Sequence, residues 1–193
     1  NKQCRDINNI IRTLLFADTI SLNIGELLLV TQNCQLVDLV NGDLVEIEKI
    51  GKEEYRCGLN FINVQVIELA SKKSYTLLLI KDILTSSTTN ISDKQHKDLM
   101  IDYYLRMKKK GIHHKDKKFK DLMKSDAYLN AIRAVYGYSL TCHKSQGGEW
   151  EEVYLYLHKS MYVMKPPGLY QWWYTATTRA KKTLFVNDDW FIS

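Results

Sequence analysis

The spacing of apolar residues predicts a helix at the start of the chain, followed by several short strands. Within residues 5–16 the isoleucines and leucines recur every three or four positions, which predicts an amphipathic helix. After Gly25 the helical period is lost, and Asn41-Gly42-Asp43 predicts a tight turn between two strands. The expected strands are residues 26–31, 36–40, 44–50, 61–69 and 75–80. Four or five short strands in close succession predict a small antiparallel β-barrel.

The second half of the chain shows both helical and strand patterns. A polar linker at residues 85–92 precedes two segments with helical spacing, 93–110 and 119–131. The remaining expected elements are strands at 133–142, 153–157 and 183–186, with a helix at 169–181. Strands that alternate with a helix predict an α/β sheet layer, so the expected fold class is α/β.

Composition narrows the class of protein. The chain has 193 residues, of which 45% are hydrophobic and 25% charged, as in one globular domain or two small ones. No apolar run approaches the roughly 20 residues that span a bilayer, and no secretory leader is present, so we expect a cytoplasmic protein without membrane contact. Four scattered cysteines without a C-x-x-C pair favour reduced thiols over a zinc site. Because the chain does not begin with Met, we expect it to belong to a longer protein.

Positive charge is concentrated in one segment. Residues 108–124 contain eight lysines and two aspartates, a formal balance of +6, whereas the whole chain carries +5 and the remainder therefore about −1. A basic segment on a nearly neutral body attracts nucleic acid electrostatically. From charge alone, a solvated loop or helix face is the more ordinary interpretation.

Several catalytic motifs are missing from the sequence. A phosphate-binding P-loop needs G-x-x-x-x-G-K-[ST]. Around the Gly51-Lys52 pair, Glu46 stands where the motif has its first glycine, and Glu53 stands where it has Ser or Thr. No G-x-S-x-G or H-E-x-x-H motif occurs, and no acidic cluster suggests a nuclease with catalytic Mg²⁺. The chain alone therefore has no recognisable machinery for nucleotide hydrolysis.

Two segments in the last third do carry candidate chemistry. YSLTCHKSQGGEW (138–150) places a hydroxyl, an imidazole, an amide and two glycines at a predicted strand end, where ligands gather in α/β sheets. WWYTATTRAKKTLFV (172–186) places Arg179 near the end of a predicted helix. An arginine delivered to a triphosphate stabilises the charge on the transferring phosphoryl group. Taken separately, each segment has a more ordinary interpretation, which is a surface arginine for the second and a plain turn for the first.

Together the two segments closely resemble the fifth and sixth helicase motifs of superfamily-1 enzymes of the RecD/UvrD type, T-x-H-K-x-Q-G-x-E and Y-T-A-x-T-R-A. GELLLVTQN and the Asn-Gly-Asp turn resemble the Src-homology-3-like insertion of RecD-like members. The resemblance implies a RecA-like C-terminal helicase domain of the P-loop NTPase type, interrupted by a small antiparallel β-barrel and a helical connector. The implied division is residues 1–24 and 131–193 for the RecA-like domain, 25–83 for the barrel and 84–130 for the lysine-rich connector.

The resemblance also implies roles for individual residues. Arg179 would reach the γ-phosphate of ATP, with Tyr174 and Thr178 as its supports. The implied nucleotide contacts are Glu149, Gly147 and Gln146. The implied contacts to single-stranded DNA are Thr141, His143, Lys144 and Arg12, and the charge of the lysine-rich segment adds Lys108, Lys109 and Lys110 as candidates. No residue is implied as a metal ligand.

In the whole enzyme, ATP and Mg²⁺ would be held mainly by the N-terminal RecA-like domain of the same protein, so this chain alone would not hydrolyse ATP. Family membership implies movement 5′→3′ along single-stranded DNA. Two alternatives stay open: a nucleic-acid-binding module without nucleotide, and a structural partner resembling an inactive subunit of a nuclease–helicase complex. Two local alternatives also remain: Arg12 and Asn8 could lie on a helix surface, and Trp172 and Trp173 could be core residues or stacking platforms for bases.

Overall fold

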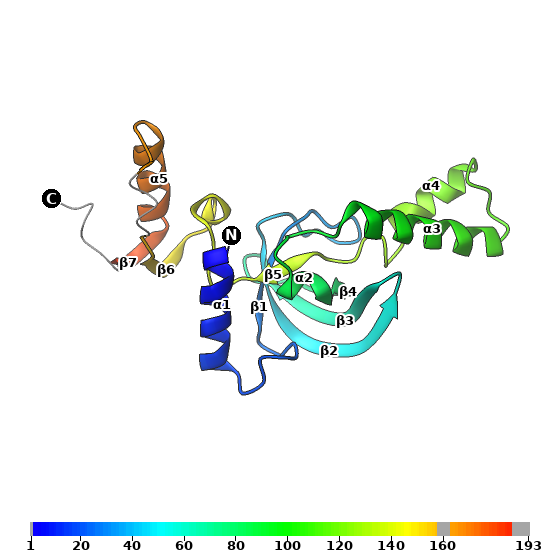
Figure 1. The fold of residues 1–193 in the computed structure, drawn as a ribbon, viewed down its shortest axis with the longest axis horizontal. Coiled ribbons are helices and arrows are strands. Elements are labelled where there is room, and N and C mark those ends of the chain that lie inside the picture. Colours follow the sequence, from blue (N-terminus) through cyan, green and yellow to red (C-terminus); the bar gives the residue numbers. More distant parts are fainter. Residues whose placement is uncertain (1, 158–162, 187–193) are drawn as a thin grey trace. The chain divides into compact units, whose positions relative to one another are not determined.

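The protein is described here by a computed structural model, which covers residues 2–157 and 163–186. Contacts divide the chain into two compact units, Asn1–Ser139 and Leu140–Ser193 (Figure 1). The sequence predicts a division near residue 131, so the contacts divide the chain at a later point. Both units combine helices and strands, and the chain is therefore mixed α/β, as expected.

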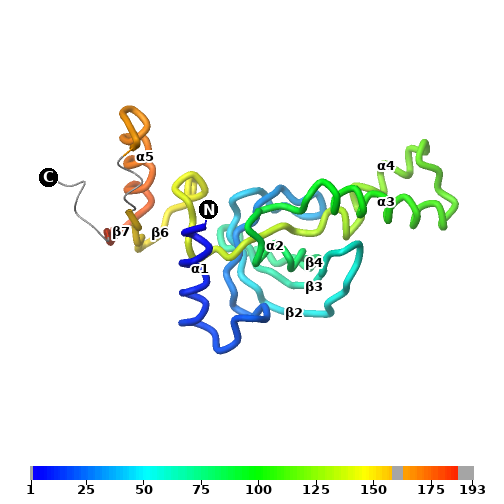
Figure 2. The backbone as a smooth tube through the Cα atoms, in the orientation of Figure 1, coloured from blue at the N-terminus to red at the C-terminus, as the bar shows by residue number. Residues whose placement is uncertain are grey.

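The first unit is built on a five-stranded antiparallel sheet that closes on itself. Its strand order is β4-β3-β2-β1-β5, with bounds β1 (Leu27–Val30), β2 (Leu44–Arg56), β3 (Leu59–Glu68), β4 (Ser74–Ile80) and β5 (Ala134–Tyr136). At the open edges, Leu79 of β4 forms a parallel bridge with Ile132, just before β5. The Ile132 N–H donates to the Leu78 carbonyl at 2.7 Å. Residues 131–136 therefore complete the curled sheet of this unit (Figure 2).

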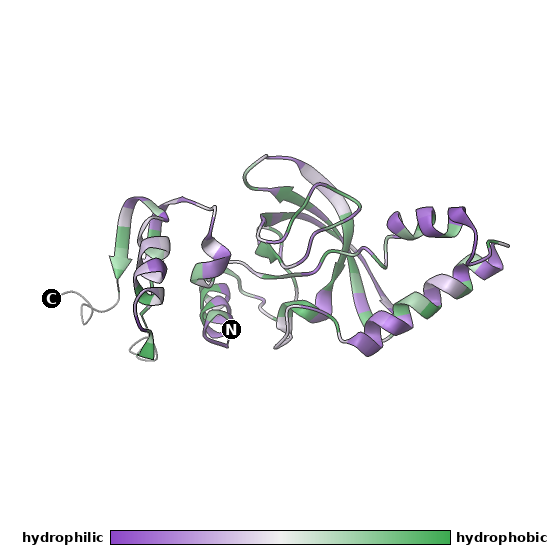
Figure 3. Cartoon of the chain, turned by 90° about the horizontal axis from the view of Figure 1, so that it is seen from above, coloured by the Kyte–Doolittle hydropathy of each residue, from purple (hydrophilic) through white to green (hydrophobic). Residues whose placement is uncertain are grey.

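Alternation along the strands explains the core of the curled sheet. Successive side chains of a strand point to opposite faces, and on β3 the exposed Asn63 lies between the buried residues Ile62 and Val64. Residues from all five strands meet inside, among them Leu28, Ile47 and Leu79, each fully buried. The apolar colour in Figure 3 is concentrated in these strands. A second cluster joins β3 and β4 to the helices α2 (Lys81–Thr85) and α3 (Asp93–Lys109).

The strand predicted at 36–40 does not form, and this expectation was wrong. Residues 31–43 are a loop, and β1 pairs directly with β2, with Leu29 opposite Leu44. The loop is held by its own backbone bonds, in which the Leu39 N–H donates to Val37 O at 2.9 Å. Leu39 is buried while Val40 is half exposed, so the apolar run caps the core without joining the sheet. The predicted turn is present, with Gly42 at a φ of 109°.

The remaining helices of the first unit are α1 (Lys2–Leu15) and α4 (Lys117–Lys124). The sequence predicts α4 as far as residue 131, but the helix ends earlier. Asp126 Oδ1 accepts the backbone N–H groups of Tyr128 and Leu129, at 3.2 and 3.1 Å, and this turn replaces the helical bonds. α3 begins as expected, because Ser92 and Gln95 form a reciprocal capping box.

The second unit is a small β-α-β arrangement. Its two strands, β6 (Trp150–Leu155) and β7 (Ala180–Val186), are parallel, and α5 (Gly168–Thr177) lies between them in sequence. The strand predicted at 133–142 is shorter than expected, and its end is replaced by a 3₁₀ turn, η1 (Cys142–Ser145). The helix predicted to residue 181 ends at Thr177, and β7 begins in its place. In the described parts of the chain, no helix combines the length and apolar character that a membrane crossing requires.

Candidate nucleotide and nucleic-acid site

The segment TCHKSQGGE forms one compact turn at the start of the second unit. The Thr141 carbonyl accepts the N–H groups of Lys144 and Ser145, at 2.9 and 3.1 Å, and these bonds create η1. The Ser145 hydroxyl donates to the Cys142 carbonyl at 2.7 Å. His143 lies on this turn and is exposed to solvent. His143 is therefore not a packed core residue.

The two glycines after the turn are both required by the backbone. Gly147 has a φ of 86°, a left-handed conformation that glycine adopts without strain. A Cβ atom at Gly148 would lie 2.4 Å from the Trp150 ring, so any side chain there would force the ring to move. The glycine pair therefore lets the chain pass from the turn directly into β6.

Arg179 joins this turn to the end of α5. Its Nε donates to the Thr175 carbonyl at 2.9 Å, Nη1 donates to the Gly148 carbonyl at 2.9 Å, and Nη2 donates to Thr178 Oγ1 at 2.9 Å. The Arg179 carbonyl in turn accepts the Trp150 N–H at 2.9 Å. Two motifs that lie far apart in the sequence therefore meet around one guanidinium group.

The acceptors of Arg179 are all neutral. Two are backbone carbonyls and one is a hydroxyl, and among the residues described here no carboxylate pairs with this guanidinium. The neighbouring Glu149 instead lies 3.7 Å from Lys181 Nζ, and both of these side chains are more than half exposed. Hydrogen bonds to an ionised acceptor are stronger than those to a neutral one. An anionic oxygen that reached Arg179 would therefore displace these acceptors.

The other predicted site residues of the second unit share the same turn. Thr141 and Lys144 are partly buried, whereas Gln146, Gly147 and Glu149 are exposed. The turn thus brings together all of the predicted nucleotide and strand contacts of this unit except Arg179, which reaches it through Gly148. Thr178 supports Arg179 directly, and its hydroxyl also donates to the Tyr174 carbonyl at 2.7 Å.

The tryptophan pair packs within the unit. Trp172 and Trp173 are partly buried, and their rings meet edge to face at 5.7 Å. The Cys142 thiol donates to the Trp172 carbonyl at 3.6 Å, so α5 and the turn are linked here as well. Burial raises the pKa of this thiol, which disfavours the reactive thiolate. These contacts favour the packing role for the two tryptophans over an open stacking platform.

Arg12 is placed differently from the prediction. Its side chain is buried in the first unit, where Nε and Nη2 donate to the Glu26 carboxylate and Nη1 donates to the Thr19 carbonyl. The guanidinium also lies 3.8 Å from the centre of the Tyr136 ring. Burial, the largest single effect, lowers the pKa of Arg12, but the hydrogen bonds that Arg12 donates to Glu26, together with the charges of Glu26 and the neighbouring tyrosines, outweigh burial and raise the pKa overall. With its donors occupied and no exposed face, Arg12 is a structural residue, and the predicted nucleic-acid contact is corrected accordingly.

The same helix exposes the face that the sequence predicts to be buried. Asn8, on the buried side, donates to the Tyr136 carbonyl at 2.8 Å and accepts the Ser139 N–H at 2.6 Å. By contrast, Ile10, Leu14 and Leu15 are each more than half exposed. The spacing of Asn8, Arg12 and the apolar residues shows that α1 is amphipathic, but does not show that its polar face packs on the curled sheet.

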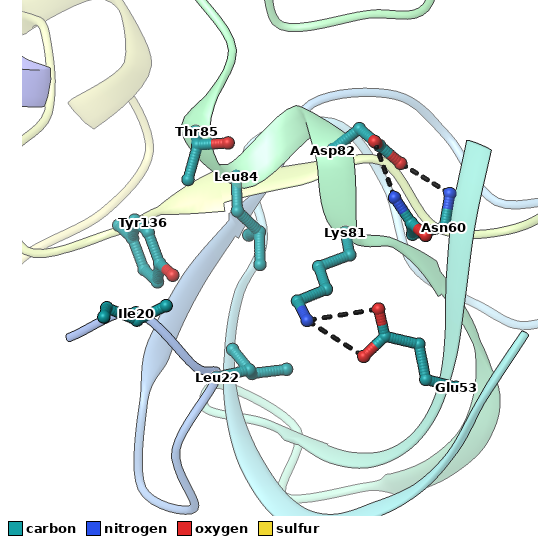
Figure 4. A pocket seen from close by; sticks show the side chains of 9 residues that line it. All are labelled: Ile20, Leu22, Glu53, Asn60, Lys81, Asp82, Leu84, Thr85 and Tyr136. Atoms are coloured by element: carbon teal, nitrogen blue, oxygen red, sulfur yellow. Dashed lines mark hydrogen bonds and ion pairs between the residues drawn. The ribbon is translucent and has the colours of Figure 1, made fainter. Parts of the chain in front are cut away.

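A pocket in the first unit is not part of this site. It lies beside α2, and each of its charged side chains already has a partner in the pocket, Lys81 with Glu53 and Asp82 with the neutral Asn60 (Figure 4). Lys81 Nζ lies 2.9 Å from Glu53, and Asp82 accepts the Asn60 N–H at 2.7 Å. No charged group in the pocket is left to receive a ligand, so the turn around Arg179 is the better candidate site.

The residues near Arg179 fit a phosphate group better than a metal ion. A guanidinium matches phosphate oxygens, whereas Mg²⁺ prefers carboxylate and water oxygens. Within residues 2–157 and 163–186, no group of three acidic, histidine or cysteine side chains is arranged to hold a cation. The residues around Arg179 therefore suit an anion such as a phosphate group better than a cation.

Comparison with known proteins points to helicases. Residues 136–186, which contain both motifs, match the family described as the UvrD-like helicase C-terminal domain, and this match supports a superfamily-1 helicase C-terminal region. A crystal structure of Pif1 helicase from Candida albicans is similar over 91% of this chain and 35% of its own, with 14% identity and a TM-score of 0.41. The chain thus spans about a third of the length of that helicase. No curated protein matches the chain.

Proposed function

We propose that this chain is the C-terminal portion of a RecD-like superfamily-1 DNA helicase, supplying an arginine finger and part of the track for single-stranded DNA. One observation carries the proposal: Arg179 joins both motifs while all of its acceptors are neutral. A guanidinium held in this way is positioned by its neighbours and remains available to an anion. The family match over residues 136–186 supports the assignment to a helicase.

In this proposal, ATP with Mg²⁺ is bound mainly by the N-terminal RecA-like domain of the same protein and supplies the transferable phosphoryl group. Arg179 exchanges its neutral acceptors for oxygens of the γ-phosphate and stabilises the charge that develops there. Glu149, Gln146 and Gly147 border the nucleotide from the turn. Because the sequence has no P-loop, the chain alone hydrolyses no ATP.

The same turn contacts the strand. Thr141, His143 and Lys144 lie on it, and the exposed imidazole of His143 is available to a base or a phosphate. The bond from Arg179 to the Gly148 carbonyl links this turn to the nucleotide side of the site. Domain closure around ATP and opening after hydrolysis would then move the turn along the strand. The RecD-like resemblance carries the further proposal that movement is 5′→3′.

The proposal also assigns each part of the chain to a domain. Residues 140–193 belong to the second RecA-like domain, and the curled sheet is the inserted Src-homology-3-like barrel. Residues 131–139, which the sequence assigns to the RecA-like domain, contribute Ile132 and β5 to the sheet. α1 remains assigned to the RecA-like domain by its resemblance, although its described contacts are with the sheet unit.

A second candidate function is a nucleic-acid-binding module without nucleotide chemistry. The observation that favours it is the lysine-rich segment 108–124, which needs no nucleotide to attract a polyanion. Such a module would have no use for an arginine held between two motifs. The two functions therefore differ in whether Arg179 matters for any activity.

Binding of single-stranded DNA by this chain tests the proposal. Fluorescence anisotropy over a salt series should show salt-dependent binding, with no ATP hydrolysis measured in parallel. His143→Ala should weaken binding by roughly fivefold, as for the loss of one contact worth about 1 kcal/mol. Arg179→Ala should leave binding unchanged, because its proposed partner is the nucleotide.

Lys182→Ala serves as the matched control, because Lys182 is three-quarters exposed and forms its ion pair with Glu151 on the surface of the same unit. ATP hydrolysis by the purified chain would overturn the proposal. Equal binding by His143→Ala and the control would remove the turn from the strand track.

A further inference from the structure

The lysine-rich segment 108–124, with a formal balance of +6, lies on a helical hairpin of the first unit. α3 and α4, with the turn between them, form an arm whose end we call the lysine tip, residues 108–124 (Figure 1). The eight lysines of the tip are Lys108, Lys109, Lys110, Lys115, Lys117, Lys118, Lys120 and Lys124. All eight are exposed, and in the described part of the chain none of them forms an ion pair. The charge of the tip is therefore not neutralised within the unit.

Two lysines of the tip occupy positions that are unfavourable for the stability of their own helix. Lys117 and Lys118 occupy the first turn of α4, which contains no acidic residue. Cations near a helix N-terminus are disfavoured by the helix dipole, by about 0.3–1 kcal/mol each. Lys108 and Lys109, in the last turn of α3, are favourably placed by the same rule. Helix stability thus accounts for the lysines of α3 but not for those of α4.

The lysine tip is folded and is not a loose chain. Tyr103 is fully buried, and its hydroxyl donates to the Phe119 carbonyl at 2.6 Å, which fastens α4 to α3. The two rings also meet at 4.9 Å. After α3, the Ile112 N–H donates to the Met107 carbonyl at 3.0 Å, which closes the turn. Of the two ordinary interpretations of the charge, a solvated loop and a solvated helix face, the structure therefore excludes the loop for the residues of α3 and α4 and leaves the exposed helix face.

The base of the arm is fixed to the curled sheet. Arg106 Nη2 donates to Asp126 Oδ1 at 3.0 Å, and Arg106 Nε donates to Asp102 at 2.7 Å. Asp102 also accepts Arg56 Nη1 of β2 at 2.9 Å, and the Arg56 guanidinium lies 4.3 Å from the Tyr128 ring centre. These contacts connect α3 to the β2–β3 end of the sheet. The tip is thus held out on a rigid support.

We propose that the lysine tip binds the phosphate backbone of double-stranded nucleic acid, separately from the turn that would hold the single strand. A duplex carries one negative charge for about every 1.7 Å of its axis, which suits closely spaced lysines without base readout. Proteins that bind single strands combine such charge with aromatic rings on which bases stack. At the tip the rings pair with one another, since His113 and His114 lie 4.2 Å apart and Tyr104 lies 6.1 Å from His114.

This inference goes beyond the proposed function and does not depend on Arg179. If the chain belongs to a helicase, the tip would hold the duplex part of a forked substrate. If the chain is only a binding module, the tip would be its main contact. The experiment below therefore uses no nucleotide, so that its result is independent of ATP chemistry.

Anisotropy with a short labelled duplex, and with one of its strands, over a salt series tests the inference. The double variant Lys117→Gln/Lys118→Gln should bind the duplex about tenfold more weakly, and the slope of log K against log salt should fall by about two. The same substitutions should not unfold α4, because they remove cations from a helix N-terminus. Circular dichroism and urea unfolding check this point.

The matched control is Lys94→Gln/Lys97→Gln. These exposed lysines lie at the start of α3, about 20 Å from the tip at 1.5 Å per residue, and they are also near a helix N-terminus. The control should bind the duplex as the unchanged chain does. Arg179→Ala and His143→Ala should also leave duplex binding unchanged, which separates this inference from the proposed function.

Three results would overturn the inference. The tip variant could bind the duplex as tightly as the control does. The tip variant could instead lose affinity for the single strand alone, with Tyr104→Ala causing the same loss, which would make the tip a single-strand contact. Finally, phosphatidylserine vesicles could bind the chain through the tip while the duplex does not, which would identify an anionic membrane as the partner.

Discussion

The two units of this protein are stabilised in different ways. The first unit, residues 2–139, buries apolar side chains from all five strands and from α2 and α3. In residues 140–157 and 163–186, only Leu157 and Ala176 are buried apolar residues. The unit that carries both helicase motifs therefore has little core of its own in the described residues.

The strands of the second unit are also poorly covered by other residues. β6 and β7 are parallel, and parallel sheets in proteins are usually covered on both faces. Here Tyr154 and Phe185 stack on each other at 4.5 Å while remaining 74% and 41% exposed. A sheet with such a surface is expected to gain stability when further protein covers it. The difference between the units shows that the proposed site residues and the buried apolar core are largely separated in this chain.

The two units also differ in how each of them binds one of its arginines, Arg12 in the first unit and Arg179 in the second. Arg12 is buried with a carboxylate partner, Glu26, and every part of its guanidinium is enclosed. Arg179 is partly buried, and its acceptors are two carbonyls and a hydroxyl. An arginine that is already paired with a buried carboxylate gains little from another anion. An arginine held by neutral groups gains a stronger interaction when an anion arrives.

The largest effect is expected from breaking the buried pair. Arg12→Ala leaves the Glu26 carboxylate buried without its partner, which should lower the free energy of unfolding of the first unit by about 3–5 kcal/mol. Urea unfolding followed by circular dichroism measures this change. The double variant Arg12→Met/Glu26→Leu removes both charges and should restore most of the loss. Equal stability of Arg12→Ala and the unchanged chain would contradict the structural role given to Arg12.

Two leucine substitutions with smaller expected losses of stability test the difference in burial between the two units. Leu79→Ala opens a cavity in the curled sheet and should cost about 2–5 kcal/mol, whereas Leu184→Ala on the partly exposed β7 should cost about 1 kcal/mol or less. All four tryptophans lie at positions 150, 172, 173 and 190, so tryptophan fluorescence reports the second unit. Circular dichroism reports both units together.

In urea, the fluorescence transition of the unchanged chain should precede the main transition in circular dichroism. Leu79→Ala should move the main transition and leave the fluorescence transition in place. A single transition that both probes follow, and that both leucine variants shift equally, would show that the units share one core after all.

Much of the fold could be predicted from the sequence, because alternation and turn residues act locally. The strands expected at 44–50, 61–69 and 75–80 follow from their apolar pattern, but β2 continues to Arg56 through mostly exposed residues that this pattern does not mark. The start of α3 follows from its helical spacing and the Ser92 cap. The 36–40 segment was misassigned because a short apolar run can cap a core as well as join a sheet. The bridge between Leu79 and Ile132 depends on residues far apart in sequence, which no local pattern contains.

The candidate site was predictable to a different degree. The resemblance to helicase motifs brought out the 141–149 turn and Arg179, but the bond from Arg179 to the Gly148 carbonyl is a property of the folded backbone. Arg12 was wrongly assigned to the nucleic-acid contacts because the sequence alone does not distinguish a surface arginine from a buried arginine that pairs with a carboxylate. Only the packing of α1 against Glu26 and Tyr136 separates the two.

Single-turnover ATP hydrolysis in the longer helicase proposed above tests the central claim most directly. Arg179→Ala should lower the rate of the chemical step by about a thousandfold or more, the effect typical of a lost arginine finger, with ATP affinity and single-strand binding nearly unchanged. Arg179→Lys should restore little of the rate, because an ammonium group lacks the planar fork of donors, and Lys182→Ala should match the unchanged enzyme. A rate for Arg179→Ala within about threefold of the Lys182→Ala rate would contradict the account, since Arg179 would then do no more than hold the two motifs together.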